Sequence, residues 1–153
     1  MLHNNNHLRD LAVENTFYLM PLAASICLLT ALVQAWILTS VRYFKMTFFR
    51  RIFKNYKDLV RSHVDYLIMS ALIMALYLMV QSMSLQVPEP ILWLVFIGAL
   101  YNPFGFILQA IKPDIAEGGF MKKVGVGIGF MPTTIGVGYV GCLVFMEALE
   151  KSF

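Results

Sequence analysis

Charged residues are scarce in this chain: they make up 14% of its 153 residues, while 59% of the residues are hydrophobic. A soluble domain carries about 25% charged residues. The shortage excludes an ordinary water-soluble globule, a disordered tail and a nucleic-acid-binding protein that relies on a broad basic surface. Because the apolar residues also come in long blocks, the composition predicts an integral membrane protein.

Cysteine is also rare. Cys27 and Cys142 both lie inside apolar runs and lack metal-ligand spacing. Buried free thiols usually behave as small hydrophobes, so we expect neither a disulfide nor a cysteine metal site. The start of the chain, with His3 and His7 around three asparagines, has no basic stretch or cleavage site of a signal peptide. We therefore expect the first apolar run to remain as a true span.

Four apolar stretches are long enough to cross a membrane, since about 20 apolar residues span a hydrocarbon layer about 30 Å thick. They lie at about 16–40, 64–83, 91–111 and 124–148. Only helices and closed barrels satisfy their backbone in lipid, and these stretches lack the alternation of barrel strands. The sequence predicts one all-α domain over residues 1–153, an integral membrane four-helix bundle.

The basic residues are concentrated on one side of the predicted bundle. Seven of the twelve lie between Arg42 and Arg61, and Lys112, Lys122 and Lys123 lie between the third and fourth spans. Loops rich in Lys and Arg stay in the cytoplasm. We therefore expect cytoplasmic basic loops, both termini on the opposite side, and a location in a bacterial inner membrane.

The segment at about 41–62 interleaves aromatic and basic residues at helical spacing. This pattern favours an amphipathic helix that lies in the headgroup region and contacts membrane lipids. Alternatively, the first span continues into the cytoplasm as one long helix. RNA binding also uses aromatic and basic residues, but beside a membrane span we expect no nucleic-acid partner.

Polar residues recur along one face of each of two spans. In the second span they are His63, Tyr66, Ser70, Tyr77 and Gln81, and in the third they are Gly98, Asn102, Gly105 and Gln109. We expect these two stripes to face one another, either as interhelical hydrogen bonds or as the wall of a pocket. Pro103 removes a backbone donor and frees a carbonyl near Ala99, which favours a pocket beside Asn102.

His63 is the histidine nearest to a span. It can be an interfacial histidine held by a hydrogen bond, or an axial ligand to haem iron, for which neutral imidazole is common. In the second case, Arg61, Lys57 and Lys54 would lie at the depth needed to bind the haem propionates. Asp65 would orient His63 or, more simply, form an ion pair with a nearby cation.

The last span is rich in glycine. Gly125 and Gly129 form a small-xxx-small pair, which allows close helix packing within the chain or between subunits. A nucleotide-binding loop is excluded because no strand precedes these glycines. Pro132, followed by Thr133 and Thr134, predicts a kink whose free carbonyls accept from hydroxyls.

Two short motifs resemble the small membrane-bound styrene oxide isomerases. One is Arg61-Ser62-His63 at the start of the second span, and the other is Asn102-Pro103-Phe104-Gly105-Phe106 in the third, followed by Pro113. The similarity covers about the last hundred residues. It implies a trimer that holds haem b between subunits, with ferric iron bound by the histidine that matches His63.

The resemblance also implies that the iron opens an epoxide to an aldehyde. However, the substrate-binding Asn and Tyr of that family fall near Met69 and Phe106, which cannot hydrogen-bond an epoxide. Tyr66, Tyr101 and Asn102 are the residues here that can replace them. The leading hypothesis is a homo-oligomeric haem b protein with epoxide isomerase activity. The alternative is a non-catalytic subunit of a larger membrane complex.

Overall fold

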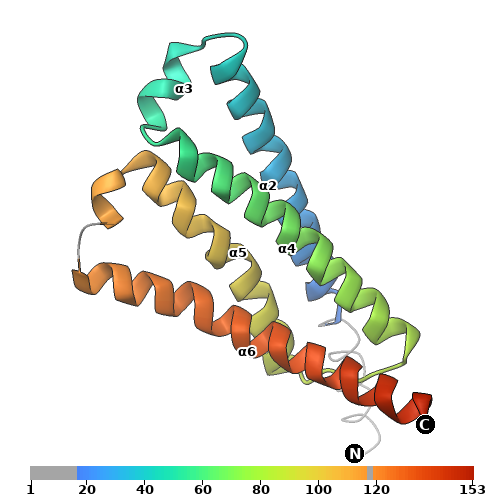
Figure 1. Ribbon diagram of the computed structural model, residues 1–153. Helices are drawn as coiled ribbons and strands as arrows, with labels where there is room; N and C mark the ends of the chain where they lie inside the picture. The colour runs from blue at the N-terminus through green and yellow to red at the C-terminus, as the bar shows by residue number, and fades with distance from the viewer. Residues whose placement is uncertain (1–16, 117–118) are drawn as a thin grey trace, which may run out of the picture.

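The computed structural model describes residues 17–116 and 119–153; the N-terminal polar stretch, including His3 and His7, lies outside the described residues. The described chain is helical, with no strand in either range. In chain order the elements are α2 (Leu19–Arg42), α3 (Thr47–Ile52), α4 (Tyr56–Ser82), α5 (Glu89–Ile111), the short 3-10 helix η1 (Pro113–Ala116) and α6 (Gly119–Ser152). Figure 1 shows how they are arranged.

The four long helices of the described residues, α2, α4, α5 and α6, are each long and apolar enough to cross a membrane. They run alternately up and down, so that the connections from α2 to α4 and from α5 to α6 lie at one end (Figure 1). The connection from α4 to α5 lies at the other end with the C-terminus. This confirms the all-α fold and an integral membrane protein with four helices.

The segment at about 41–62 differs from both forms expected of it. α2 ends at Arg42, and the chain turns through Lys45, whose φ of 51° is in the left-handed region. A long continuous helix is therefore wrong. The helix expected in this segment is limited to the six residues of α3. A new helix, α4, begins after Asn55, whose side chain caps it by accepting from the Lys57 backbone N–H at 3.1 Å.

His63 consequently lies two turns inside α4, which begins at Tyr56, rather than at the head of a helix. At the other end of the bundle α5 begins after Pro88, with Pro90 in its first turn, where a missing N–H is tolerated. It stops at Ile111 because Pro113 disfavours helical backbone at Lys112, which has φ −128° and ψ 88°.

Small residues bring α2 close to its neighbours. Ala23, Ala24, Cys27 and Ala31 are fully buried along one face of α2, in a core shared with α4 and α5. Small side chains let helix backbones approach closely. This increases the number of van der Waals contacts, which hold helices together in lipid. Large apolar side chains such as Leu29 and Val33 point outward instead, as expected of a surface that faces lipid.

α6 packs on α5 through glycine. A Cβ placed on Gly98 of α5 would lie 2.5 Å from the Thr133 backbone nitrogen, and one on Gly136 of α6 would lie 2.7 Å from the nitrogen of Val95. Gly98 therefore faces α6 rather than α4. The prediction that the two polar stripes face one another along their length is wrong at Gly98 and also at Gln81, which is exposed.

Candidate functional site

Side chains of α4 donate hydrogen bonds to backbone carbonyls of α5 near Pro103. Ser62 Oγ donates to the Pro103 carbonyl at 3.0 Å, and Tyr66 Oη donates to the Leu100 carbonyl at 3.0 Å. The Ala99 carbonyl, whose usual N–H partner Pro103 lacks, is 3.6 Å from Cys27 Sγ of α2. The freed carbonyl near Ala99 that the sequence predicted is thus met by a thiol, and side chains of both α2 and α4 contact the backbone of α5 around Pro103.

His63 is held by α2. Its Nδ1 lies 2.9 Å from the Ala31 carbonyl oxygen, and the side chain is half-buried. Because a carbonyl can only accept, Nδ1 is the donor, and in the neutral imidazole Nε2 then presents its lone pair. A backbone carbonyl on the other ring nitrogen is the usual way in which a metal-ligating histidine is oriented. This geometry suits an imidazole ligand, and it equally suits a histidine that joins two helices.

The sequence analysis missed Gln34 of α2. Its side chain is 3% exposed, its Nε2 donates to Ser62 Oγ at 3.1 Å, and its Oε1 is buried without a hydrogen-bond partner among the described residues. Gln34 lies one turn beyond Ala31, the residue that binds His63. The available signal was one amide within the first apolar run, since a polar group in a span is expected to face the bundle interior.

The three predicted catalytic residues differ in exposure. Tyr66 is buried and its hydroxyl donates to Leu100. Tyr101 is 54% exposed and its ring contacts that of Phe104, with centroids 6.3 Å apart. Asn102 is half-buried next to Gly129 of α6. The Tyr66 hydroxyl is thus engaged by α5, whereas the Tyr101 side chain is directed to the surface of the chain.

The predicted propionate-binding cations lie at the basic end of α4. Arg61 Nη1 is 3.4 Å from Asp58 Oδ1, while the Arg61 side chain remains 68% exposed. Lys57 is exposed, and Lys54 precedes the helix. Asp65 is half-buried and takes part in neither of the ion pairs of the described residues, so the ion pair expected for it is absent there. Arg61 and Lys57 therefore remain accessible to an anion.

The surroundings of His63 bear on whether a porphyrin fits. His63 lines neither of two cavities found at the ends of the bundle. Its neighbours one turn away on α4, Val60 and Leu67, are exposed apolar side chains. A half-buried imidazole beside an exposed apolar surface offers one wall for a flat apolar ring. The donor and one wall fit a haem, and the second wall would have to come from another chain.

Comparison with protein-family models, with curated proteins and with solved structures finds no match to this chain. Its site must therefore be interpreted from its own geometry.

Proposed function

We propose that this protein binds haem b through Nε2 of His63, at an interface between copies of the chain. The observation that carries the proposal is the hydrogen bond from His63 Nδ1 to the Ala31 carbonyl, which leaves the second ring nitrogen for a ligand. Arg61 and Lys57, exposed at the same end of α4, are the partners of the two propionates. A second copy, as in the trimer suggested by the family resemblance, supplies the opposite wall.

The proposed activity is the redox-neutral isomerisation of a small hydrophobic epoxide to an aldehyde. A ferric haem with one protein ligand supplies an open Lewis-acid position. The residues of this chain then orient the substrate: Asn102 donates a hydrogen bond from its amide, and the exposed Tyr101 hydroxyl is the second donor available on α5. Tyr66 keeps the segment of α5 around Pro103 in place through its hydrogen bond to the Leu100 carbonyl.

The basic residues give the proposed orientation of the helices in the membrane. The loop with α3 and the start of α6 lie at the same end, so that ten of the twelve basic residues gather there. By the positive-inside bias, this end faces the cytoplasm of a bacterial inner membrane, and both termini lie on the opposite side.

A visible absorption spectrum of the detergent-purified protein, expressed with ample haem, tests the proposal. We expect a haem band in the wild type and in His7→Ala, which removes another histidine, and no band in His63→Ala. Added imidazole should restore the band in His63→Gly, because it replaces the missing ligand. Circular dichroism checks that each variant is folded. A wild type without a band, or a band that persists in His63→Ala, contradicts the proposal.

A second candidate function, a structural subunit of a larger membrane complex, is favoured by the open face of α6. A Cβ added at Gly138 or Gly141 would meet no atom within 4 Å, so these glycines are not used to pack the described chain. If the purified wild type lacks haem and loses its folded structure in the absence of other membrane proteins, this second function replaces the first.

A further inference from the structure

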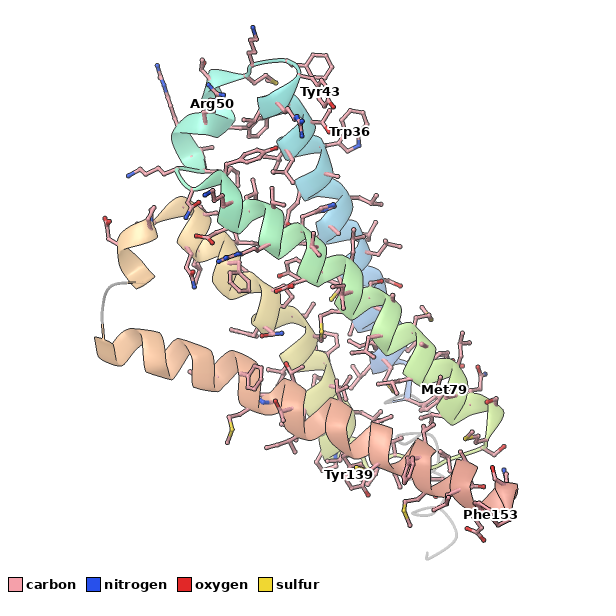
Figure 2. All side chains as sticks on the ribbon, in the orientation of Figure 1. Trp36, Tyr43, Arg50, Met79, Tyr139 and Phe153 are labelled. Carbon is pink, nitrogen blue, oxygen red and sulfur yellow. The ribbon has the colours of Figure 1, made fainter. Side chains whose placement is uncertain are left out.

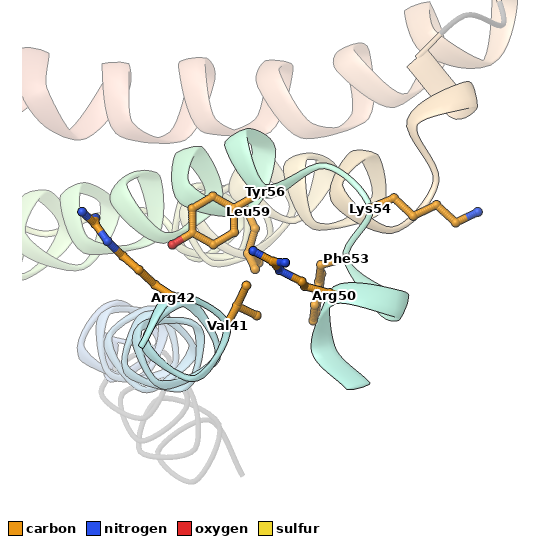
Figure 3. A pocket seen from close by; sticks show the side chains of 7 residues that line it. All are labelled: Val41, Arg42, Arg50, Phe53, Lys54, Tyr56 and Leu59. Atoms are coloured by element: carbon orange, nitrogen blue, oxygen red, sulfur yellow. The ribbon is translucent and has the colours of Figure 1, made fainter. Parts of the chain in front are cut away.

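A basic cavity of about 510 Å³ lies between the end of α2, α3 and the start of α4. Ligand pockets in proteins commonly enclose roughly 300–1,000 Å³. Figure 3 shows Arg50 pointing toward the middle of the cavity, between Val41 and Tyr56, while Lys54 reaches away from it. The residues that line it are Val41, Arg42, Arg50, Phe53, Lys54, Tyr56 and Leu59.

The lining of the cavity carries positive charge that no carboxylate neutralises. It includes two arginines and one lysine but no acidic residue. The one acid of the surrounding segment, Asp58, is buried and bonded to Asn55 Nδ2 and Arg61. The two ion pairs within residues 17–116 and 119–153 join Asp58 to Arg61 and Glu147 to Lys151, so neither involves Arg42, Arg50 or Lys54. The cavity therefore favours an anion.

The other part of the lining is apolar. Val41 and Leu59 are buried beneath the arginines, Leu59 completely, and Phe53 is half-buried. A small hydrated anion would gain nothing from these side chains. An amphiphile that joins a phosphate to an apolar chain would use both parts of the surface.

The cavity lies at the depth of lipid headgroups. Trp36 and Tyr43, which are 69% and 70% exposed, project from the same end of α2 (Figure 2). Exposed tryptophan and tyrosine gather where the hydrocarbon meets the headgroups. Below this level the outer face of α2 presents Leu29, Leu32 and Val33, an apolar path for acyl chains.

We propose that this basic cavity binds the headgroup of an anionic phospholipid, with the phosphate held by Arg50, which points into the cavity, and with Arg42 at the edge of the cavity. Guanidinium groups bind phosphate through paired hydrogen bonds. Zwitterionic lipids are disfavoured because their ammonium group would lie among cations. The site is separate from the proposed haem site, since His63, Arg61 and Lys57 are not part of the lining.

Native mass spectrometry of the full chain in mild detergent tests this proposal. The probes are phosphatidylglycerol and phosphatidylethanolamine added to delipidated protein. The variant R42Q/R50Q removes the two arginines that line the cavity, whereas the control K45Q/R51Q removes two charges of the same segment outside it. Each cation near an anionic lipid contributes roughly a factor of five. We therefore expect phosphatidylglycerol binding to fall about 25-fold in R42Q/R50Q and much less in the control.

Three results would overturn the proposal. Equal losses in the two variants would show diffuse attraction rather than a site, and equal retention of both lipids would exclude selection by charge. If inorganic phosphate bound as tightly as phosphatidylglycerol, the ligand would be a free anion instead of a lipid. Circular dichroism checks the folding of each variant. Should R42Q/R50Q fail to fold, R50Q alone takes its place and should lose about fivefold.

Discussion

The two sides of α5 are held to their neighbours in different ways. Toward α2 and α4, the carbonyls of Ala99, Leu100 and Pro103 accept hydrogen bonds from side chains. Toward α6, Gly98 lies against the backbone of Thr133, and side-chain hydroxyls of α6 bond only to carbonyls of their own helix, such as that of Gly129. One side is joined by polar groups and the other by close approach.

The two kinds of helix contact should differ in how well they tolerate substitution. Hydrogen bonds between membrane helices contribute about 0.6 kcal/mol on average, so losing one leaves the others in place. Close approach depends on the absence of a side chain at Gly98 and Gly136, so a single methyl group added there moves one helix relative to the other. The polar side should therefore tolerate substitution better than the glycine side.

The largest effect is expected for Gly98→Ala. Its new Cβ would overlap backbone atoms of Thr133, which cannot rotate away as a flexible side chain could. Overpacking of this kind typically costs about 1–3 kcal/mol. Thermal unfolding in detergent, followed by circular dichroism, should show a lower midpoint for Gly98→Ala than for the wild type.

Gly105→Ala is the matched control, because a Cβ at Gly105 of the same helix meets nothing within 4 Å. It should leave the midpoint unchanged or raise it slightly, as Ala has the better helix propensity.

The buried Cys27 adds a second measurement, with the exposed Cys142 as internal reference. Cys27 lies on the side of α5 that faces α2, whereas Gly98 faces α6. If the two sides are independent, Cys27 should stay buried in Gly98→Ala and should react with maleimide as slowly as in the wild type. Equal midpoints for the two variants would refute the close-approach account.

A smaller effect is expected for Tyr66→Phe, which removes the hydrogen bond to the Leu100 carbonyl but keeps the buried ring. The free energy of unfolding should fall by about 0.6 kcal/mol and by no more than about 1.7 kcal/mol. Labelling of Cys27 should become faster, since its partner Ala99 is the residue before Leu100. Unchanged labelling together with an unchanged stability would show that the bond does not hold α5 against α4.

The smallest effect is expected for Thr134→Ala. The Thr134 hydroxyl is exposed and donates to the Phe130 carbonyl of its own helix at 2.9 Å, so it joins no two helices. The change in the free energy of unfolding should stay within about 0.5 kcal/mol. A larger loss, measured by the same thermal unfolding, would mean that hydroxyls of α6 support the α5–α6 contact after all.

Much of this architecture could be predicted from the sequence. The spans follow from apolar length, and the free carbonyl near Ala99 follows from Pro103, because both depend on local chemistry. The partners of these groups could not be predicted. Gly98 was placed in a polar stripe by its spacing, yet its neighbour is Thr133, because the rotation of α5 against α6 is set by the fit of whole surfaces.

In the candidate site, too, single residues could be predicted but their contacts with other helices could not. His63 could be singled out from its type and its place beside a span, but its bond to Ala31 depends on how α2 lies along α4, as does the bond from Gln34 to Ser62. No pattern within one helix specifies that alignment. Tyr66, Tyr101 and Asn102 were grouped because each can hydrogen-bond a substrate in place of the family's Asn and Tyr. Their type does not reveal that Tyr66 is buried and Tyr101 is exposed.

The bonds from α4 to α2 fix more than two local contacts. His63 and Ser70 are seven residues apart on α4, and the carbonyls that they bind, of Ala31 and Ala24, are seven residues apart on α2. A slide of one helix by a single turn would break both bonds at once, whereas a common tilt of the two helices keeps them. In a bilayer of different thickness, tilting the pair together is therefore favoured over moving one helix along the other.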